Sequence, residues 1–393
     1  MYKNIDKLIS VSKDIKKFLA ENNAECVDRK RKIDICDAVT YKFLYTKYNT
    51  TQEKATIKLN NLKRTNVSRQ ALVKKENKLT HTFYDQLAAK LMATIDKNFK
   101  KKRVKQIIAV DGTYPTFLSS LTNDNFTANK KGTSVTPLIT GLFNVTYNFS
   151  VAMELAKTKN EMQEFLKFLK NKTEYENTIF VFDKGYQGDK FFKDLDDKEL
   201  QFICRIKDNS NYIKGKSKDY TVRSSLKTKL RIVKYKIDKQ EYHIATNNFD
   251  MSANEIKHVY HQRWSVEEYF KYVKQTMKLA KIEEQREFNI RKTIAAHLIV
   301  SQLGYLFTIM NNKKKTDGKV LNRSILMEGL YETFLYRFLN NKGFSKYYLV
   351  NFFNTYVQYI KTNAGTTSDR ICKRPNFRWY FKAHFKNAKY VST

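Results

Sequence analysis

The spacing of apolar side chains divides the chain into a helical region and a strand-forming region. Over residues 1–104 apolar residues recur every three or four positions, a period that predicts amphipathic helices. The clearest stripes are Leu8, Ile15 and Phe18, and Phe83, Leu87 and Leu91. From residue 105 short apolar runs replace this period, and the runs at 106–111 and 178–183 each end in an aspartate. Such runs are typical of buried strands.

The order of these runs predicts the topology of the central region. Two further strands are expected at 137–145 and 147–155, then a helix over 162–169, and a last strand at 201–206 after a short helix. The order β-β-β-α-β-α-β, with acids at two strand ends, indicates an α/β ribonuclease H-like core. In that core helices join a three-stranded meander to parallel strands.

The rest of the chain completes a five-part prediction. Residues 207–251 alternate apolar and polar positions and suggest inserted strands, 252–279 one long helix, and 291–310 a buried helix. The predicted domains are a helical DNA-binding domain (1–104), the first part of the core (105–207), a β-rich basic insertion (208–251), the second part of the core (252–312) and a basic helical C-terminal region (313–393).

The charge of the chain points to a polyanionic partner. The 393 residues carry 74 Lys+Arg against 39 Asp+Glu, a net charge of +35. A genome rich in A and T would inflate the lysine count, but the excess is uneven: +11, +2, +10 and +12 in successive hundreds. The nearly neutral second hundred contains 13 acidic residues, so carboxylates have a role there.

Two basic segments are candidates for contact with DNA. Residues 207–239 hold eleven Lys/Arg against three Asp, interleaved with Tyr212, Tyr220 and Tyr235. This composition suits phosphate contacts with base stacking, and it equally suits a solvated hairpin. Around Ser68, a serine that could cap a helix starting at Arg69, the pattern fits either a helix-turn-helix or a plain helical hairpin.

Cysteine spacing and hydropathy exclude several classes of protein. The four cysteines form no C-x2-C pair and the six histidines no H-E-x-x-H, which argues against a zinc site and a disulfide framework. No apolar run approaches the length of a membrane span, and no signal segment opens the chain. We expect a soluble protein that is not secreted.

A candidate catalytic stripe lies on the predicted helix over 252–279. At about 100° per residue, Tyr260, Arg263, Glu267 and Lys274 fall on one stripe about 60° wide at the edge of the apolar face. The alternative is an ordinary i,i+4 pair between Arg263 and Glu267. The neighbouring Trp264 either stacks on a flipped base or packs against the protein, and packing is the favoured role.

Three carboxylates can be combined into a metal site. Asp111 and Asp183 end their strands, and Glu267 adds a third acid from the helix. Carboxylate oxygens are the ligands that Mg²⁺ or Mn²⁺ prefers, and two such ions about 4 Å apart can promote phosphodiester cleavage.

The spacing Tyr260-x2-Arg263-x3-Glu267-x6-Lys274 resembles the Y-R-E-K signature of the transposase family named after insertion sequence four, within the Asp-Asp-Glu superfamily of cut-and-paste transposases. Further similar segments are Asp183-Lys184-Gly185-Tyr186, Ala245–Asn248, Arg263–Glu267 and Arg374–Tyr380. The resemblance covers about residues 60–385.

The resemblance implies a ribonuclease H-like fold with a β insertion between the second Asp and the Glu. By the family pattern Asp111, Asp183 and Glu267 bind divalent metal. The expected metal is Mg²⁺ or Mn²⁺, with two ions as the two-ion chemistry implies. Tyr260, Arg263 and Lys274 hold the phosphate of the transposon end by the same pattern. Arg205, Lys207, Lys184 and Arg69 are further candidate DNA contacts.

The implied function is cut-and-paste transposition at terminal inverted repeats by phosphodiester hydrolysis and strand transfer. Double-stranded DNA is the expected partner, with a homodimer joining two ends, in the cytoplasm or nucleoid of a bacterium or the nucleus of another host. The alternative is a domesticated DNA-binding protein on the same scaffold that does not cleave.

Overall fold

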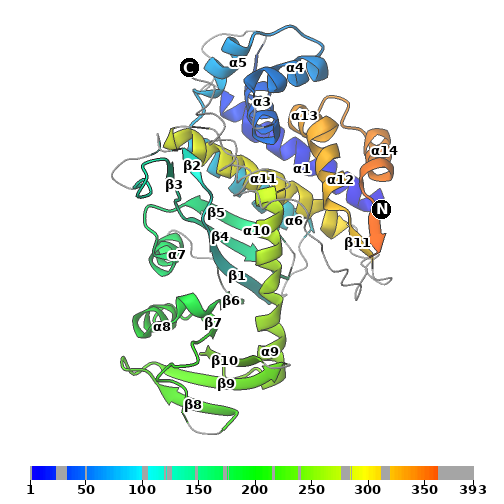
Figure 1. Cartoon of the computed structure of the whole chain (residues 1–393). Helices are drawn as coiled ribbons and strands as arrows, with labels where there is room; N and C mark the ends of the chain where they lie inside the picture. Colours follow the sequence, from blue (N-terminus) through cyan, green and yellow to red (C-terminus); the bar gives the residue numbers. More distant parts are fainter. Residues whose placement is uncertain are drawn as a thin grey trace, which may run out of the picture.

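A mixed sheet of eight strands lies at the centre of the fold (Figure 1). The computed structural model describes residues 2–23, 33–48, 51–99, 105–118, 121, 126–146, 149–170, 175, 177–214, 217–237, 240–275, 284, 286–310 and 319–361. In spatial order the strands are β5 (Phe149–Leu155), β4 (Ile139–Asn144), β1 (Gln106–Thr113), β6 (Thr178–Phe182), β7 (Gln201–Arg205), β10 (Gln240–Thr246), β9 (Lys229–Ile237) and β8 (Asp219–Arg223).

The strand directions are those of a ribonuclease H-like core. β1, β4 and β5 form an antiparallel meander, whereas β6 is parallel to β1 and β7 is parallel to β6. Helix α7 (Glu161–Lys170) connects β5 to β6, and α8 (Asp189–Asp196) connects β6 to β7. The predicted order β-β-β-α-β-α-β and the α/β fold class are therefore confirmed.

Helices cover both faces of the central strands, which explains their continuous apolar sequence. On one face of β1, Val110 belongs to a cluster with Phe165 of α7. On the other face, Ala109 belongs to a cluster with Phe270 of α10 (Trp264–Gln275). Next to α10, α9 (Ala253–Gln262) packs Ile256 on β6. Every residue of β6 is buried as a result.

The inserted strands continue the central sheet. β10 pairs antiparallel with β7, and β9 and β8 follow outward to the edge of the sheet (Figure 1). The predicted β insertion is confirmed, and the structure adds that its strand β10 shares backbone hydrogen bonds with β7 of the central sheet. The exact domain boundaries stay predictions.

The tyrosines of the basic insertion are held within the protein. Tyr212 is buried, with its ring 6.0 Å from that of Phe192. The Tyr220 hydroxyl donates to the carbonyl of Tyr212 at 3.1 Å, and Tyr235 stacks on Tyr242 with ring centroids 5.2 Å apart. These rings are engaged by neighbouring residues, so we do not assign them to base stacking.

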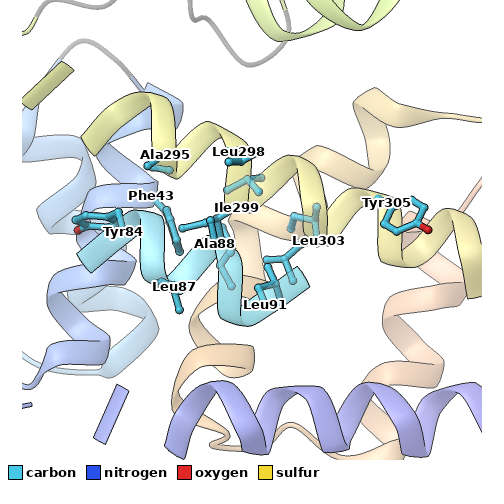
Figure 2. Packing of buried hydrophobic residues seen from close by; sticks show 14 of the residues in the cluster. Phe43, Tyr84, Leu87, Ala88, Leu91, Ala295, Leu298, Ile299, Leu303 and Tyr305 are labelled. Atoms are coloured by element: carbon cyan, nitrogen blue, oxygen red, sulfur yellow. The ribbon is translucent and has the colours of Figure 1, made fainter. Parts of the chain in front are cut away.

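The helices of the N-terminal region pack with a long apolar helix of the core. α3 (Ile35–Tyr48) and α6 (His81–Phe99) contact α11 (Glu287–Met310), and α1 (Tyr2–Glu21) packs on α6. Figure 2 shows the contact between α6 and α11, where Ala88 lies close to Ile299 and Leu91 close to Leu303. The predicted stripes are buried in this cluster, apart from Phe18, which is partly buried at its border.

Two shorter helices complete the N-terminal region. α4 (Gln52–Lys63) and α5 (Arg69–Glu76) are joined by a turn that ends at Ser68. The Ser68 hydroxyl accepts a hydrogen bond from the backbone N–H of Ala71 at 3.3 Å, which is the predicted N-cap. This geometry fits both a helix-turn-helix and a helical hairpin.

The C-terminal region is helical, as predicted, with one addition. It contains α12 (Arg323–Gly329), a π-helical turn η5 (Leu330–Phe334), α13 (Leu335–Asn340) and α14 (Lys346–Tyr356). The addition is a two-stranded ribbon of β11 (Lys319–Leu321) and β12 (Tyr359–Lys361), which lie before and after these helices in the sequence. A similar short ribbon, also not predicted, pairs β2 (Phe117–Leu118) with β3 (Ser134–Val135) in the core region. Strands of two or three residues are too short to show a period. The motif Arg374–Tyr380 lies outside the described residues.

The predicted single helix over 252–279 is in fact two helices. It begins as expected, with a capping box between Ser252 and Glu255, but α9 and α10 are separated at Arg263. There the N–H of Arg263 bonds to the carbonyl of Tyr260, and that of Val266 to Arg263, three residues apart instead of four. This tightening interrupts the α-helical ladder. Residues 276–279 lie outside the described part.

In the described chain no helix combines the length and apolar character needed to cross a membrane.

Candidate active site

Asp111 and Asp183 lie at the same level on neighbouring parallel strands. β1 and β6 pair with Ala109 opposite Val181, so Asp111 and Asp183 each follow two residues later. Asp183 comes directly after β6, as predicted, and begins the short 3-10 helix η2 (Lys184–Tyr186). Asp111 lies inside β1 because its pairing with β4 continues to Thr113, which corrects the predicted strand end. Parallel strands thus bring both acids to one edge of the sheet.

A glycine opposite Asp111 lets α10 approach the sheet. Asp111 pairs with Gly141 of β4. A β-carbon at position 141 would lie 2.6 Å from Cζ of Phe270, so only the absence of a side chain leaves room for that ring. Phe270 follows Glu267 by three residues on α10. The close approach therefore holds the helix that carries Glu267 over the strand that carries Asp111.

Glu267 forms an ion pair with Arg263, so the pairing given above as the alternative interpretation is present. Arg263 Nη2 donates to Glu267 Oε1 at 2.6 Å. The pair is shielded from solvent, since the side chain of Arg263 is only 11% exposed and that of Glu267 34%. It differs from a surface pair in this burial, and it is compatible with a site at the edge of the core.

Two partly buried arginines have Nε donors that none of the described residues satisfies. Nε of Arg205 and Nε of Arg263 are inaccessible to solvent and have no hydrogen-bond partner within the described chain. Arg205, the last residue of β7, stacks its guanidinium over the ring of Tyr242 at 4.7 Å. Buried donors are normally paired, so unpaired ones indicate a missing acceptor. Both guanidinium groups act electrostatically on the buried phenol of Tyr260.

The pKa values at this edge of the sheet reflect burial, neighbouring carboxylates and nearby arginines. Burial raises the pKa of Asp111 to about 6, and the charges of Glu161 and Asp183 add to this, while the Gly112 N–H and Arg263 oppose it. Burial also raises the pKa of Tyr260 to about 12, so its hydroxyl stays protonated at neutral pH. The phenol is thus a hydrogen-bond donor in this site.

The acids do not form a closed metal site in this conformation. Within the described residues, no three side chains of the types Asp, Glu, His or Cys are grouped closely enough to hold a metal ion. The donor chemistry fits a hard divalent cation, because Asp111, Asp183 and Glu267 all offer carboxylate oxygens. Glu267 is directed to Arg263 instead.

The remaining candidate residues are distributed around this edge and away from it. Lys184 is exposed in η2 directly after Asp183, and Lys207 is exposed two residues after Arg205. Lys274 lies in α10, but its side chain is outside the described part. Arg69 is remote from the site in the sequence and pairs with Glu53 at 2.9 Å on the N-terminal helices.

The prediction that Trp264 packs against the protein is wrong. Its side chain is 59% exposed, and the ammonium of Lys271 lies 5.6 Å from its ring centroid. The break at Arg263 places Trp264 at the start of a new helix, where the angles of one continuous helix do not apply.

Sequence reasoning missed one acid of the site. Glu161, the first residue of α7, directs its carboxylate over Gly112 and accepts a hydrogen bond from the Tyr114 hydroxyl at 2.9 Å. An acid in the first turn of a helix is common because it interacts favourably with the helix dipole, so the sequence gives no signal of this contact.

A ribonuclease H-like sheet with acids at one edge and partly buried arginines beside them defines a nuclease-type enzyme. The profile of the transposase DDE domain matches residues 102–303, just over half of the chain, and the protein therefore belongs to this transposase family. Transposases of this family act on DNA and generally use divalent metal ions. No curated protein matches the chain.

Proposed function

We propose that the protein catalyses cut-and-paste transposition of an insertion sequence, as a member of the transposase family named after insertion sequence four. The observation that carries this proposal is the pair of buried, unsatisfied Nε donors of Arg205 and Arg263 beside the aspartates of β1 and β6. A DNA phosphate supplies the missing acceptor oxygens, and arginine binds phosphate in a geometry that lysine cannot reproduce.

The guanidinium groups and the phenol orient the scissile phosphate. Arg263 has a free Nε while Nη2 holds Glu267, so it can bind a phosphate oxygen and the carboxylate together. Tyr260, protonated at neutral pH, donates a further hydrogen bond. In hydrolysis water attacks phosphorus and the 3′-oxygen of the transposon end leaves. In strand transfer that 3′-hydroxyl attacks a target phosphate and displaces another 3′-oxygen.

The carboxylates of Asp111, Asp183 and Glu267 are the proposed ligands of Mg²⁺ or Mn²⁺, two ions in the full site. Divalent cations supply Lewis-acid stabilisation of the phosphate and of the attacking and leaving oxygens. Ionised Asp111 is needed for this role, and its raised pKa of about 6 leaves it ionised at neutral pH. Arg263 contacts Oε1 of Glu267, so Oε2 would serve as the metal ligand while the ion pair stays intact.

Basic residues outside the centre are proposed to hold the flanking DNA. Lys184 and Lys207 follow Asp183 and Arg205 at the same edge, Lys274 continues along α10, and Arg69 contacts DNA from the N-terminal helices. A homodimer that joins two transposon ends is the proposed active assembly. We propose that it works in the cytoplasm or nucleoid of a bacterium, or in the nucleus of another host.

The test uses purified full-length protein, Mg²⁺ and a duplex with the inverted repeats that flank the gene. The wild type should cleave at the repeat, whereas Asp111→Ala and Glu267→Ala should bind in a gel-shift assay without cleaving. Arg205→Ala should weaken binding and reduce the slope of log K against log salt by about 1. Persistent cleavage by both acid variants would refute the ligand assignment, and specific binding without cleavage by the wild type would favour the domesticated binder.

A further inference from the structure

Glu161 and Asp111 both contact the same glycine, although they come from different elements. Asp111 Oδ1 accepts a hydrogen bond from the N–H of Gly112 at 2.9 Å. A β-carbon at position 112 would lie 2.7 Å from Oε1 of Glu161, so the carboxylate occupies the space that a side chain would take. Gly112 is therefore the point at which α7 brings a fourth acid to the edge formed by β1 and β6.

The position of the Glu161 carboxylate is fixed by Tyr114 and not by a basic residue. Tyr114, one residue beyond the end of β1, donates its hydroxyl to Oε1 at 2.9 Å. Among the described residues no Lys, Arg or His forms an ion pair with Glu161, in a protein whose net charge is +35. The charge of Glu161 is therefore not balanced by a neighbouring cation among the described residues.

A second observation comes from Tyr186. Its ring is 1% exposed, and its hydroxyl lies within hydrogen-bonding reach of Glu161 but meets full hydrogen-bond geometry with none of the described residues. Burial, and after it the negative charges of Glu161 and Asp111, raises the pKa of this phenol, so both carboxylates are its electrostatic neighbours. A buried hydroxyl that is close to both carboxylates and has no well-formed hydrogen bond leaves a place for a further polar ligand.

From this arrangement we propose that Glu161 is a fourth carboxylate of the active site and binds a divalent cation together with Asp111. The inference rests on the proposed function, which assigns Asp111 to the metal. Its chemistry is that of the other three acids, a hard oxygen donor suited to Mg²⁺ or Mn²⁺. Tyr114 orients the carboxylate, and Tyr186 supplies a hydroxyl for a water of the cation's coordination shell.

The test is a titration of the full-length protein with Mn²⁺ alone, with free Mn²⁺ measured by electron paramagnetic resonance. Glu161→Gln keeps the shape and an oxygen for Tyr114 but removes the charge, and it should weaken Mn²⁺ binding about 10- to 100-fold. The matched control is Glu164→Gln on the same helix, because Glu164 already has Thr158 and Lys167 as partners at 2.8 Å. The control should bind Mn²⁺ within about twofold of the wild type.

The variant Asp111→Asn distinguishes failure of the Glu161 assignment from failure of the proposed function. If Asp111→Asn loses Mn²⁺ and Glu161→Gln binds as the wild type does, the fourth carboxylate is refuted while the proposed function stands. If Asp111→Asn binds as the wild type does, the metal assignment of the proposed function fails as well. Thermal unfolding without metal checks that each variant is folded, and Glu161→Asp, which keeps the charge on a shorter side chain, should bind with intermediate affinity.

Discussion

Replacing Gly141 by alanine is expected to displace the helix that carries Glu267. The new β-carbon would lie 2.6 Å from Cζ and 3.2 Å from Cε1 of Phe270. Carbon atoms pack at about 3.5–4.0 Å, so the ring has to move by roughly 1 Å. Phe270 is buried in the cluster between α10 and the sheet and cannot turn out into solvent. The movement is therefore passed to α10.

The expected effect is larger on cleavage than on stability. Overpacking of this kind costs about 1–3 kcal/mol of unfolding free energy, which a domain of this size survives. A displacement of about 1 Å in a catalytic group can lower the rate about 100-fold. The variant should therefore stay folded and lose about two orders of magnitude in single-turnover cleavage of the inverted-repeat duplex.

Two further variants make the assay specific. Leucine at position 270 lacks Cζ and Cε1, so adding Phe270→Leu to Gly141→Ala should restore part of the rate. Gly304→Ala in α11 is the control, because its β-carbon would meet the Met327 sulfur at an ordinary 3.9 Å. Wild-type cleavage by Gly141→Ala, or equal losses in Gly304→Ala, would show that close approach at position 141 does not position Glu267.

Two other predictions concern stability. Because burial raises the pKa of Asp111 from 3.8 to about 6, the native state binds an extra proton between those values and loses stability as pH rises through that window. The free energy of unfolding of metal-free Asp111→Asn, measured in urea, should thus exceed that of the wild type by about 3 kcal/mol at pH 7.5 and by little at pH 4. A less stable variant at pH 7.5 contradicts the assignment. Glu284→Ala leaves the ammonium of Lys42 buried without its partner at 2.7 Å and should cost about 3–5 kcal/mol, against less than about 1 kcal/mol for Glu21→Ala in the exposed pair with Lys17. Equal urea midpoints for the two glutamate variants would refute the burial argument.

The sequence was sufficient to predict the core strands and the level of the two aspartates. The apolar run before Asp183 is buried on both faces, and parallel pairing with β1 brings Asp111 alongside. These features depend on local period and on the rule that neighbouring parallel strands end at one edge, and both are visible in a single chain.

Other features depend on packing between distant segments and could not be predicted. The contact of Glu161 with Gly112 joins residues 49 positions apart and depends on the angle of α7 to the sheet. The tightened turn at Arg263 changes the direction of the Trp264 side chain. A helical-wheel projection assumes one uninterrupted helix, so it could not predict this change. The unsatisfied Nε of Arg205 likewise appears only when its surroundings are known.

The pairing of β10 with β7 has a mechanical consequence for how DNA is handled. Arg205 lies opposite Ile244 in that pairing, and the same ladder continues through β9 to the basic outer strands. Under the proposed function, any DNA contact made by β9 would be joined to Arg205 by backbone hydrogen bonds of one sheet and not by a flexible linker. A rotation of the outer strands would therefore move Arg205 together with them.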